Sequence, residues 1–126
     1  FDVARAVDYS GTGYDLICFF DCLHDMGDPV AAAEHAGRAI APGGTVMLVE
    51  PFANDRIEDN IGTVGQLYYT GSTVICCAHA ISEGGKMVLG AQAGQARLED
   101  VFRKAGFTHF RRAAETPFNL ICEVRL

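Results

Sequence analysis

Two stretches of this 126-residue chain decide its fold: YDLICFFDCLHDMGDP at residues 14–29 and TVMLVEP at residues 45–51. The first begins with the apolar run Tyr14–Phe20, which has the length and composition of a strand buried on both faces of a sheet. The second is another such run. Between them, Asp28 and Pro29 predict a helix start, because Asp caps free amides and Pro is tolerated at the first helical position. We therefore predict a parallel strand–helix–strand unit.

The helix that begins at Pro29 is expected to pack closely on this sheet, because small side chains let a helix approach a sheet. The expected inner face consists of Val30, Ala33, Gly37, Ile40 and Ala41. Residues 42–44, with the sequence Pro-Gly-Gly, are expected to end the helix.

The middle of the chain predicts a further helix, although its glycines lower the helix propensity. Apolar residues keep a helical spacing, and the expected inward stripe consists of Ile61, Val64, Tyr68, Gly71, Ile75 and Ala78. The Gly-rich residues 82–94 that follow have a composition that often forms a lid or a pocket wall.

The last part of the chain predicts a helix followed by an antiparallel hairpin. The segment Ala96–Ala105 is amphipathic, and Gly106 is a typical C-terminal stop. Its expected inner residues are Leu98, Val101, Phe102 and Ala105. Residues 107–113 and 119–126 have strand patterns on either side of a turn.

The composition excludes several classes of protein. The chain is 49% hydrophobic and 21% charged, as soluble globular domains are, and no apolar run approaches the roughly 20 residues of a membrane-spanning helix. Residues 1–60 carry eleven acidic side chains against three basic ones, in a chain of net charge −6. Such an acidic segment repels phosphate backbones, so we expect no nucleic-acid binding.

The five cysteines predict no metal site. Cys18 and Cys22 are closely spaced, but no second pair of Cys or His residues accompanies them, whereas zinc needs converging ligands. Most of the cysteines lie in apolar stretches, where a free Cys behaves as a small hydrophobe. We expect a reduced, cytoplasmic protein.

Residues 14–29, followed by Leu48-Val49-Glu50-Pro51, resemble the fourth strand, the turn after it and the fifth strand of class I S-adenosylmethionine-dependent methyltransferases. The segment LEDVFRKAGF at residues 98–107 resembles the helix that precedes the terminal hairpin of that fold. Residues 20–28 and 50–59 are similar to an actinobacterial-type group that often carries an N-terminal winged helix. The resemblance implies an α/β, Rossmann-like fold and S-adenosylmethionine as the cofactor.

The chain departs from this family in one large respect: the Gly-rich loop after the first strand and the ribose-binding acid after the second have no counterpart. We therefore expect residues 1–126 to be the C-terminal portion of a methyltransferase domain, inactive alone, with Phe1–Ala4 near its third strand. The strand at Leu16–Phe20 would then present an unpaired apolar edge, which favours pairing with another chain. The expected partner is the missing N-terminal half or a second copy of this chain.

The resemblance implies that His24 is the catalytic base, as in small-molecule O-methyltransferases with a similar Leu-His-Asp pattern. An unperturbed His has a pKa of about 6.5, which suits proton transfer near neutrality. In that family an acid at the position of Glu50 orients the His. The alternatives are a turn residue for His24 and a solvated strand-end carboxylate for Glu50. Asp25 and Asp28 are expected to be turn and capping residues.

For the cofactor, the resemblance implies contacts with the segment around Arg5 and Ala6, where Arg5 replaces the usual acid and Ala6 offers its backbone amide. Phe20 and Asp21 match positions that line the cofactor pocket. Phe20 is alternatively a core residue.

Tyr68 and Tyr69 are candidate substrate-binding residues, because the corresponding helix covers the active site in the family; their alternative role is packing. The expected function is methylation of a small molecule at a hydroxyl. A second hypothesis is a non-catalytic metabolite-sensing or assembly module with the same fold. Half of a nicotinamide-dependent dehydrogenase is a weaker alternative, because the terminal hairpin argues against it.

Overall fold

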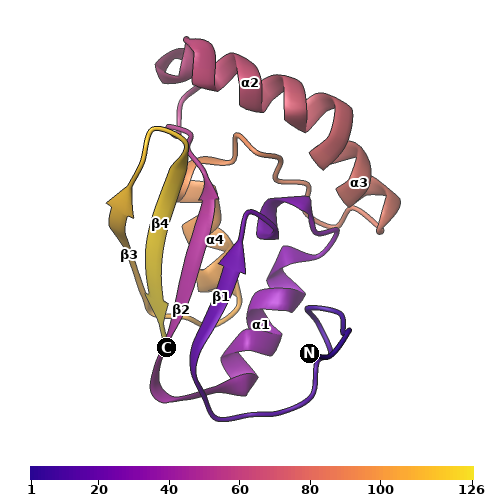
Figure 1. The fold of residues 1–126 in the computed structure, drawn as a ribbon, viewed down its shortest axis with the longest axis vertical. Helices are drawn as coiled ribbons and strands as arrows, with labels where there is room; N and C mark the ends of the chain where they lie inside the picture. The colour runs from indigo at the N-terminus through magenta and orange to yellow at the C-terminus, as the bar shows by residue number, and fades with distance from the viewer.

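The computed structural model describes the whole chain, residues 1–126. Its centre is a four-stranded sheet in the order β1-β2-β4-β3 (Figure 1). The strands are β1 (Tyr14–Phe20), β2 (Ile40–Pro51), β3 (His109–Glu115) and β4 (Asn119–Arg125). β1 and β2 are parallel, and the other two pairs are antiparallel. The predicted parallel unit and the terminal hairpin are both confirmed.

The helices are α1 (Pro29–Ala39), α2 (Thr63–Gly71), a π-helical segment (Ser72–Cys76), α3 (Cys77–Ser82) and α4 (Gly94–Lys104). Short 3-10 turns cover Leu23–Asp25 and Ile57–Asn60. The segment from α2 to α3 forms one long rod across the ends of the strands, whereas α4 lies behind the sheet (Figure 1). None of the helices has the length and apolar character needed to cross a membrane.

The first helix begins as predicted, because the Asp28 side chain accepts a hydrogen bond from the Ala31 amide at 3.0 Å. It ends at Ala39, earlier than predicted, since the next residue is already extended. The Pro-Gly-Gly sequence at residues 42–44 therefore lies inside β2. Of the predicted inner face, Ala33 is fully buried, but the other fully buried alanines are Ala32 and Ala36.

The core lies between one face of the sheet and the helices α1 and α4. Phe102 of α4 is fully buried and makes edge-to-face contacts with Phe19 of β1 and with Phe107, with ring centroids 6.2 and 5.3 Å apart. Leu98 and Val101 are also buried, as predicted, and Gly106 ends the helix region with φ +93°. The amphipathic pattern therefore identified the inner face of α4 correctly.

The apolar stripe predicted for residues 61–78 is wrong. Ile61 and Ile75 are 86% and 63% exposed, whereas Ser72, Cys76 and Ala80 are buried. Ser72 and Cys76 are the first and last residues of the π-helical segment, and Ala80 lies about one turn further on, in α3. This inner face lies toward the turn after β1 and not toward the apolar sheet core, so it carries polar groups.

Phe1–Ala4, which were expected near the third strand of the family, form no strand here; residues 1–5 have no regular secondary structure. A strand forms where a neighbour satisfies its backbone hydrogen bonds, and these residues lie beside no strand. β1 matches its predicted bounds, but it is not buried on both faces. Leu16 is 54% exposed and Phe20 is 60% exposed.

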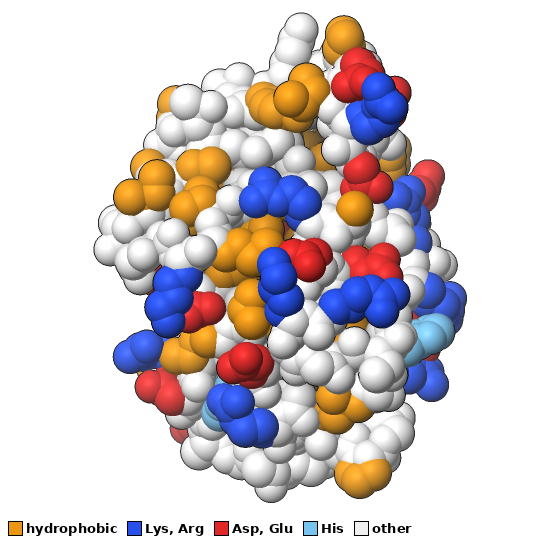
Figure 2. Space-filling view, turned by 180° about the vertical axis from the view of Figure 1, so that it is seen from behind, with side chains coloured by type: hydrophobic (Ala, Val, Ile, Leu, Met, Phe, Trp, Pro, Cys, Tyr) orange, Lys and Arg blue, Asp and Glu red, His pale blue; other side chains and the backbone are white.

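The two faces of the sheet differ in character. On the side opposite the view of Figure 1, acidic and basic side chains lie close together (Figure 2), and α4 contributes the ion pairs Arg103–Glu99 and Lys104–Asp100. The face toward the viewer in Figure 1 carries no helix. There, Phe20 pairs in register with Val49, which pairs with Ile121. An apolar stripe therefore runs from the free edge of β1 across this open face.

We expect this chain to self-associate when it is alone in solution, because β1 offers unpaired backbone groups and apolar side chains. Light scattering should give a mass of at least twice 13.5 kDa. Leu16→Lys at the edge should lower that mass. Leu67→Lys is the matched control, because Leu67 on α2 is 56% exposed, nearly as much as Leu16. A monomer at all concentrations would contradict the prediction.

Candidate active site

The carboxyl ends of β1 and β2 bring His24 and Glu50 into contact. Glu50 lies near the end of β2, and His24 lies in the 3-10 turn directly after β1. Since parallel strands end at the same edge of a sheet, the two side chains meet there. The distance between His24 Nδ1 and Glu50 Oε2 is 2.6 Å, and Glu50 is only 1% exposed. Glu50 is therefore not a solvated strand-end carboxylate.

The second carboxylate oxygen of Glu50 fixes the turn that carries His24. Oε1 accepts hydrogen bonds from the backbone amides of Cys22 and Leu23, at 3.2 and 2.9 Å. A buried carboxylate needs such donors, because its desolvation is otherwise costly. One side chain thus joins β2 to the backbone after β1 and to the His24 ring.

This contact also determines how the His24 ring is used. An ionised carboxylate only accepts hydrogen bonds, so Nδ1 of His24 donates to Glu50 and Nε2 carries the lone pair when the ring is neutral. Nε2 lies 3.3 Å from Asp25 Oδ1. Burial alone lowers the pKa of His24, but the hydrogen bond to Glu50 and the charges of Glu50, Asp25 and Asp21 outweigh it and raise the pKa above the ordinary 6.5. The imidazole of His24 is therefore a stronger base than that of a free histidine.

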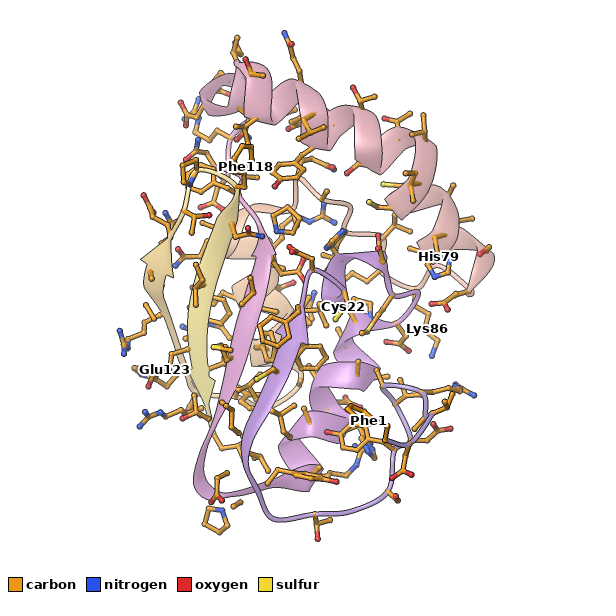
Figure 3. The ribbon with its side chains drawn as sticks, viewed as in Figure 1. Phe1, Cys22, His79, Lys86, Phe118 and Glu123 are labelled. Carbon is orange, nitrogen blue, oxygen red and sulfur yellow. The ribbon has the colours of Figure 1, made fainter.

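A cavity of about 570 Å³ opens beside the turn that carries His24; Cys22 and Asp25 of this turn line it, whereas His24 and Glu50 do not. This volume lies in the range of small-molecule sites, roughly 300–1,000 Å³. Its walls come from the N-terminal segment, from the turn that includes Cys22 and Asp25, and from α3 with the residues after it, including His79 and Glu83. Figure 3 shows Cys22 and His79 on the sheet side and the helix side of this region. Glu83 lies in the Gly-rich stretch that was expected to form a pocket wall.

The residues predicted to bind the cofactor are divided between two places. Arg5 and Ala6 line the cavity, but Phe20 and Asp21 do not. Phe20 is exposed, so it is not a core residue either. Asp21 has φ +44° and accepts a hydrogen bond from the Asn119 side chain at 2.8 Å. Phe20 and Asp21 are therefore exposed at the carboxyl end of β1, outside the cavity.

The predicted substrate-binding residues Tyr68 and Tyr69 do not line the cavity. The Tyr68 hydroxyl donates to the carbonyl oxygen of Phe118 at 2.6 Å and thereby fastens α2 to the β3–β4 turn (Figure 3). From this helical rod it is His79 that reaches the cavity wall.

Cys76 is a site residue that sequence reasoning missed. It comes from the π-helical segment and is 8% exposed. Its thiol and the ligand atoms of His24 and Asp25 lie within 4.8 Å of one another. Burial first, and then the nearby Asp25, raises the pKa of the Cys76 thiol to about 11. No spacing in the sequence links Cys76 to His24; only the path of the helix does.

Asp28 plays the capping role predicted for it and adds an ion pair. Its carboxylate lies 2.8 Å from the Lys86 ammonium group, and Lys86 belongs to the Gly-rich stretch after α3. The hydrogen bond with Lys86, and then the one with the Ala31 amide, lower the pKa of Asp28. This pair joins the start of α1 to the segment that borders the cavity.

Comparisons with known proteins identify the family and the fold. A family model described as a methyltransferase domain matches residues 2–111. No curated protein matches the chain by sequence.

Among solved structures, human N-acetylserotonin methyltransferase in complex with SAM has a TM-score of 0.71 at 17% identity, over 98% of this chain and 32% of its own. TnmH has a TM-score of 0.77 at 19% identity, over 99% and 34%. The mitomycin 7-O-methyltransferase MmcR has a TM-score of 0.66 at 14% identity, over 98% and 33%. The chain thus spans about a third of each relative.

The family model covers most of the chain, and the relatives superpose on nearly all of its fold. The chain therefore belongs to the methyltransferase-domain family and has the class I methyltransferase fold over the part that it spans.

Proposed function

We propose that this chain supplies the base-bearing portion of an S-adenosylmethionine-dependent methyltransferase that acts on a hydroxyl group of a small molecule. The observation that carries the proposal is the buried pair of His24 and Glu50, joined at 2.6 Å in a turn whose Cys22 and Asp25 line a cavity. The name of one structural relative, a mitomycin 7-O-methyltransferase, supports a hydroxyl acceptor.

In the proposed reaction, Nε2 of His24 takes the proton of the acceptor hydroxyl. Glu50 holds the ring through Nδ1, fixes the tautomer and stabilises the imidazolium that forms. Asp25, 3.3 Å from Nε2, adds a second negative charge beside that imidazolium. Methyl transfer itself needs mainly alignment of the two reacting centres, which the rigid turn after β1 favours.

The cavity supports the cofactor assignment in part. Its N-terminal wall contains Arg5 and Ala6, and its size suits a ligand of this class. When bound, S-adenosylmethionine would supply an activated methyl group on a sulfonium. Phe20 and Asp21 would contact it at the open end of the sheet, where the Gly-rich loop of the expected N-terminal half would complete the site.

The proposal therefore makes the N-terminal half of the domain, or a second copy of this chain, the partner on the free edge of β1. The apolar stripe across the open face supports such a partner. Calorimetric titration of S-adenosylhomocysteine into the chain tests whether this portion alone holds a usable cofactor site. Heat of binding would support a cofactor site within this chain alone. No heat of binding would support a cofactor site that the chain shares with its partner.

We expect His24→Ala to lower turnover by about 10²-fold or more in the assembly that includes the cofactor loop, because general-base help is typically of that size. His109→Ala is the matched control, since His109 is an exposed histidine on β3. Steady-state kinetics with both variants give the comparison. Unchanged turnover in His24→Ala, together with intact cofactor binding, would instead favour the metabolite-sensing module.

A second prediction concerns the pKa of His24, which should lie above 6.5 in the wild-type chain and fall in Glu50→Gln. The amide variant removes the negative charge that favours the imidazolium. An NMR titration of the imidazole resonances measures both values. Glu58→Gln is the control, because Glu58 is exposed and pairs with Arg56. A wild-type pKa at or below 6.5 would contradict the assignment.

The same shift predicts a pH dependence of stability. A pKa raised by folding stabilises the native state fully below the unfolded value of about 6.5, and this contribution is lost as the pH rises through the folded pKa. Urea unfolding of the wild type across this pH range should show the decline. The decline should disappear in His24→Gln, which has no titrating imidazole at this position.

A further inference from the structure

The side chains of His24, Asp25 and Cys76 converge on one point. One ring nitrogen of His24, one carboxylate oxygen of Asp25 and Sγ of Cys76 lie within 4.8 Å of one another, and Nε2 is the nitrogen 3.3 Å from Asp25. His24 and Cys76 are buried, and Asp25 is partly exposed and lines the cavity. Nitrogen, oxygen and sulfur donors thus meet at Asp25, the one residue of the three that lines the cavity.

The electrostatics of this point favour a cation. With Nδ1 of His24 donating to Glu50, the lone pair of Nε2 faces Asp25 Oδ1 at 3.3 Å. Asp25 Oδ1 is buried without a well-aligned hydrogen-bond donor, and the Cys76 thiol is the other group that contacts this carboxylate. Two facing lone pairs repel each other unless a positive group lies between them, and a buried acceptor without a donor is costly. A proton on Nε2 fills this role in part, and a metal ion would fill it fully.

We propose that His24, Asp25 and Cys76 form a binding site for a divalent zinc-type ion. Binding of the ion does not require His24 to be a catalytic base. The effect of the ion on methyl transfer, however, rests on the proposed function. A metal on Nε2 occupies the lone pair that a general base needs, so the ion would inhibit methyl transfer.

The environment of His24 matches that of a metal ligand in a further respect. Metal-binding histidines almost always donate their other ring N–H to a carboxylate or carbonyl group, which fixes the tautomer. Glu50 makes this contact at 2.6 Å. The mixed donor set suits zinc, whereas magnesium and calcium prefer oxygen ligands.

The distances require only a small adjustment. Zinc ligands at 2.0–2.3 Å from the metal are separated by about 3.4–3.6 Å in a tetrahedral site. The His24–Asp25 separation of 3.3 Å already fits, and the farthest pair must close by about 1 Å from its 4.8 Å limit. Binding converts the Cys76 thiol to a thiolate, and its proton leaves to solvent. Because Asp25 lines the cavity, a fourth ligand can be water from that side.

Cobalt(II) is the probe for this site, because a thiolate bound to cobalt gives a charge-transfer absorption band. We expect titration of the chain with Co²⁺ to give this band with one ion per chain, and Zn²⁺ to displace it. Cys76→Ser should abolish the band, and Asp25→Asn should weaken binding at least tenfold. Glu50→Gln should weaken it by about 10–100-fold, as loss of a partner of a ligating His does.

Cys77→Ser is the matched control, because Cys77 is the next residue in the chain and lies outside the cluster. Cys18→Ser controls for the exposed thiol on β1. An undiminished band in Cys76→Ser, or loss of the band only in Cys18→Ser, would overturn the site. Circular dichroism checks the fold of each variant, and Asp25→Asn decides the matter if Cys76→Ser does not fold.

An activity measurement separates this proposal from the proposed function. In the assembly that includes the cofactor loop, Zn²⁺ should inhibit the wild type, and Cys76→Ala should resist that inhibition. Binding of the ion without inhibition would support the site and refute the role of His24 as base. Absence of the cobalt band in an active enzyme would refute the site and leave that role standing.

Discussion

The buried contact between Glu50 and His24 is the interaction on which the site depends. Glu50 reaches from β2 and accepts hydrogen bonds from two backbone amides and from the His24 ring. These bonds compensate for the desolvation of the carboxylate, and they also fix the turn after β1 in one conformation. The same carboxylate raises the pKa of His24 against the effect of burial. The Glu50 side chain thus both fixes the turn after β1 and sets the basicity of His24. The pairing of β1 with β2 brings Glu50 next to this turn.

The open sheet explains the remaining features of the molecule. The helices α1 and α4 cover one face and supply a dense apolar core, which includes the aromatic cluster around Phe102. The other face and the outer edge of β1 have no such cover, so Leu16 and Phe20 stay exposed. The relatives of known structure extend well beyond the part that this chain matches. Under the proposed function, the His24–Glu50 pair makes this chain the base-bearing portion, and the partner proposed for the free edge of β1 would supply the rest of the cofactor site.

The helical rod from α2 to α3 packs against the strand ends and also contributes Cys76 to the site. It lies over the ends of the strands and is fastened by Tyr68 at one end, through the carbonyl oxygen of Phe118. In its middle, Ser72 accepts a hydrogen bond from the Ala91 amide at 2.6 Å, and Cys76 faces Asp25. Ser72 and Cys76 are the two ends of the π-helical segment between α2 and α3, and both are buried. The buried residues of the rod therefore include polar and sulfur-bearing side chains, which an apolar helical stripe could not indicate.

The sequence by itself determined the elements whose signals are local. The bounds of β1, the Asp28 cap, the inner face of α4 and the terminal hairpin all follow from hydrophobic periodicity, capping chemistry and turn residues, which act within a few positions. The sequence also placed His24 and Glu50 at neighbouring strand ends, because parallel strands end at one edge. Only the tertiary structure decided that Glu50 is buried, that Asp25 and Cys76 join His24, and that residues 1–5 form no strand. These outcomes depend on contacts between distant segments and on which neighbouring strands are present, and no local pattern encodes either.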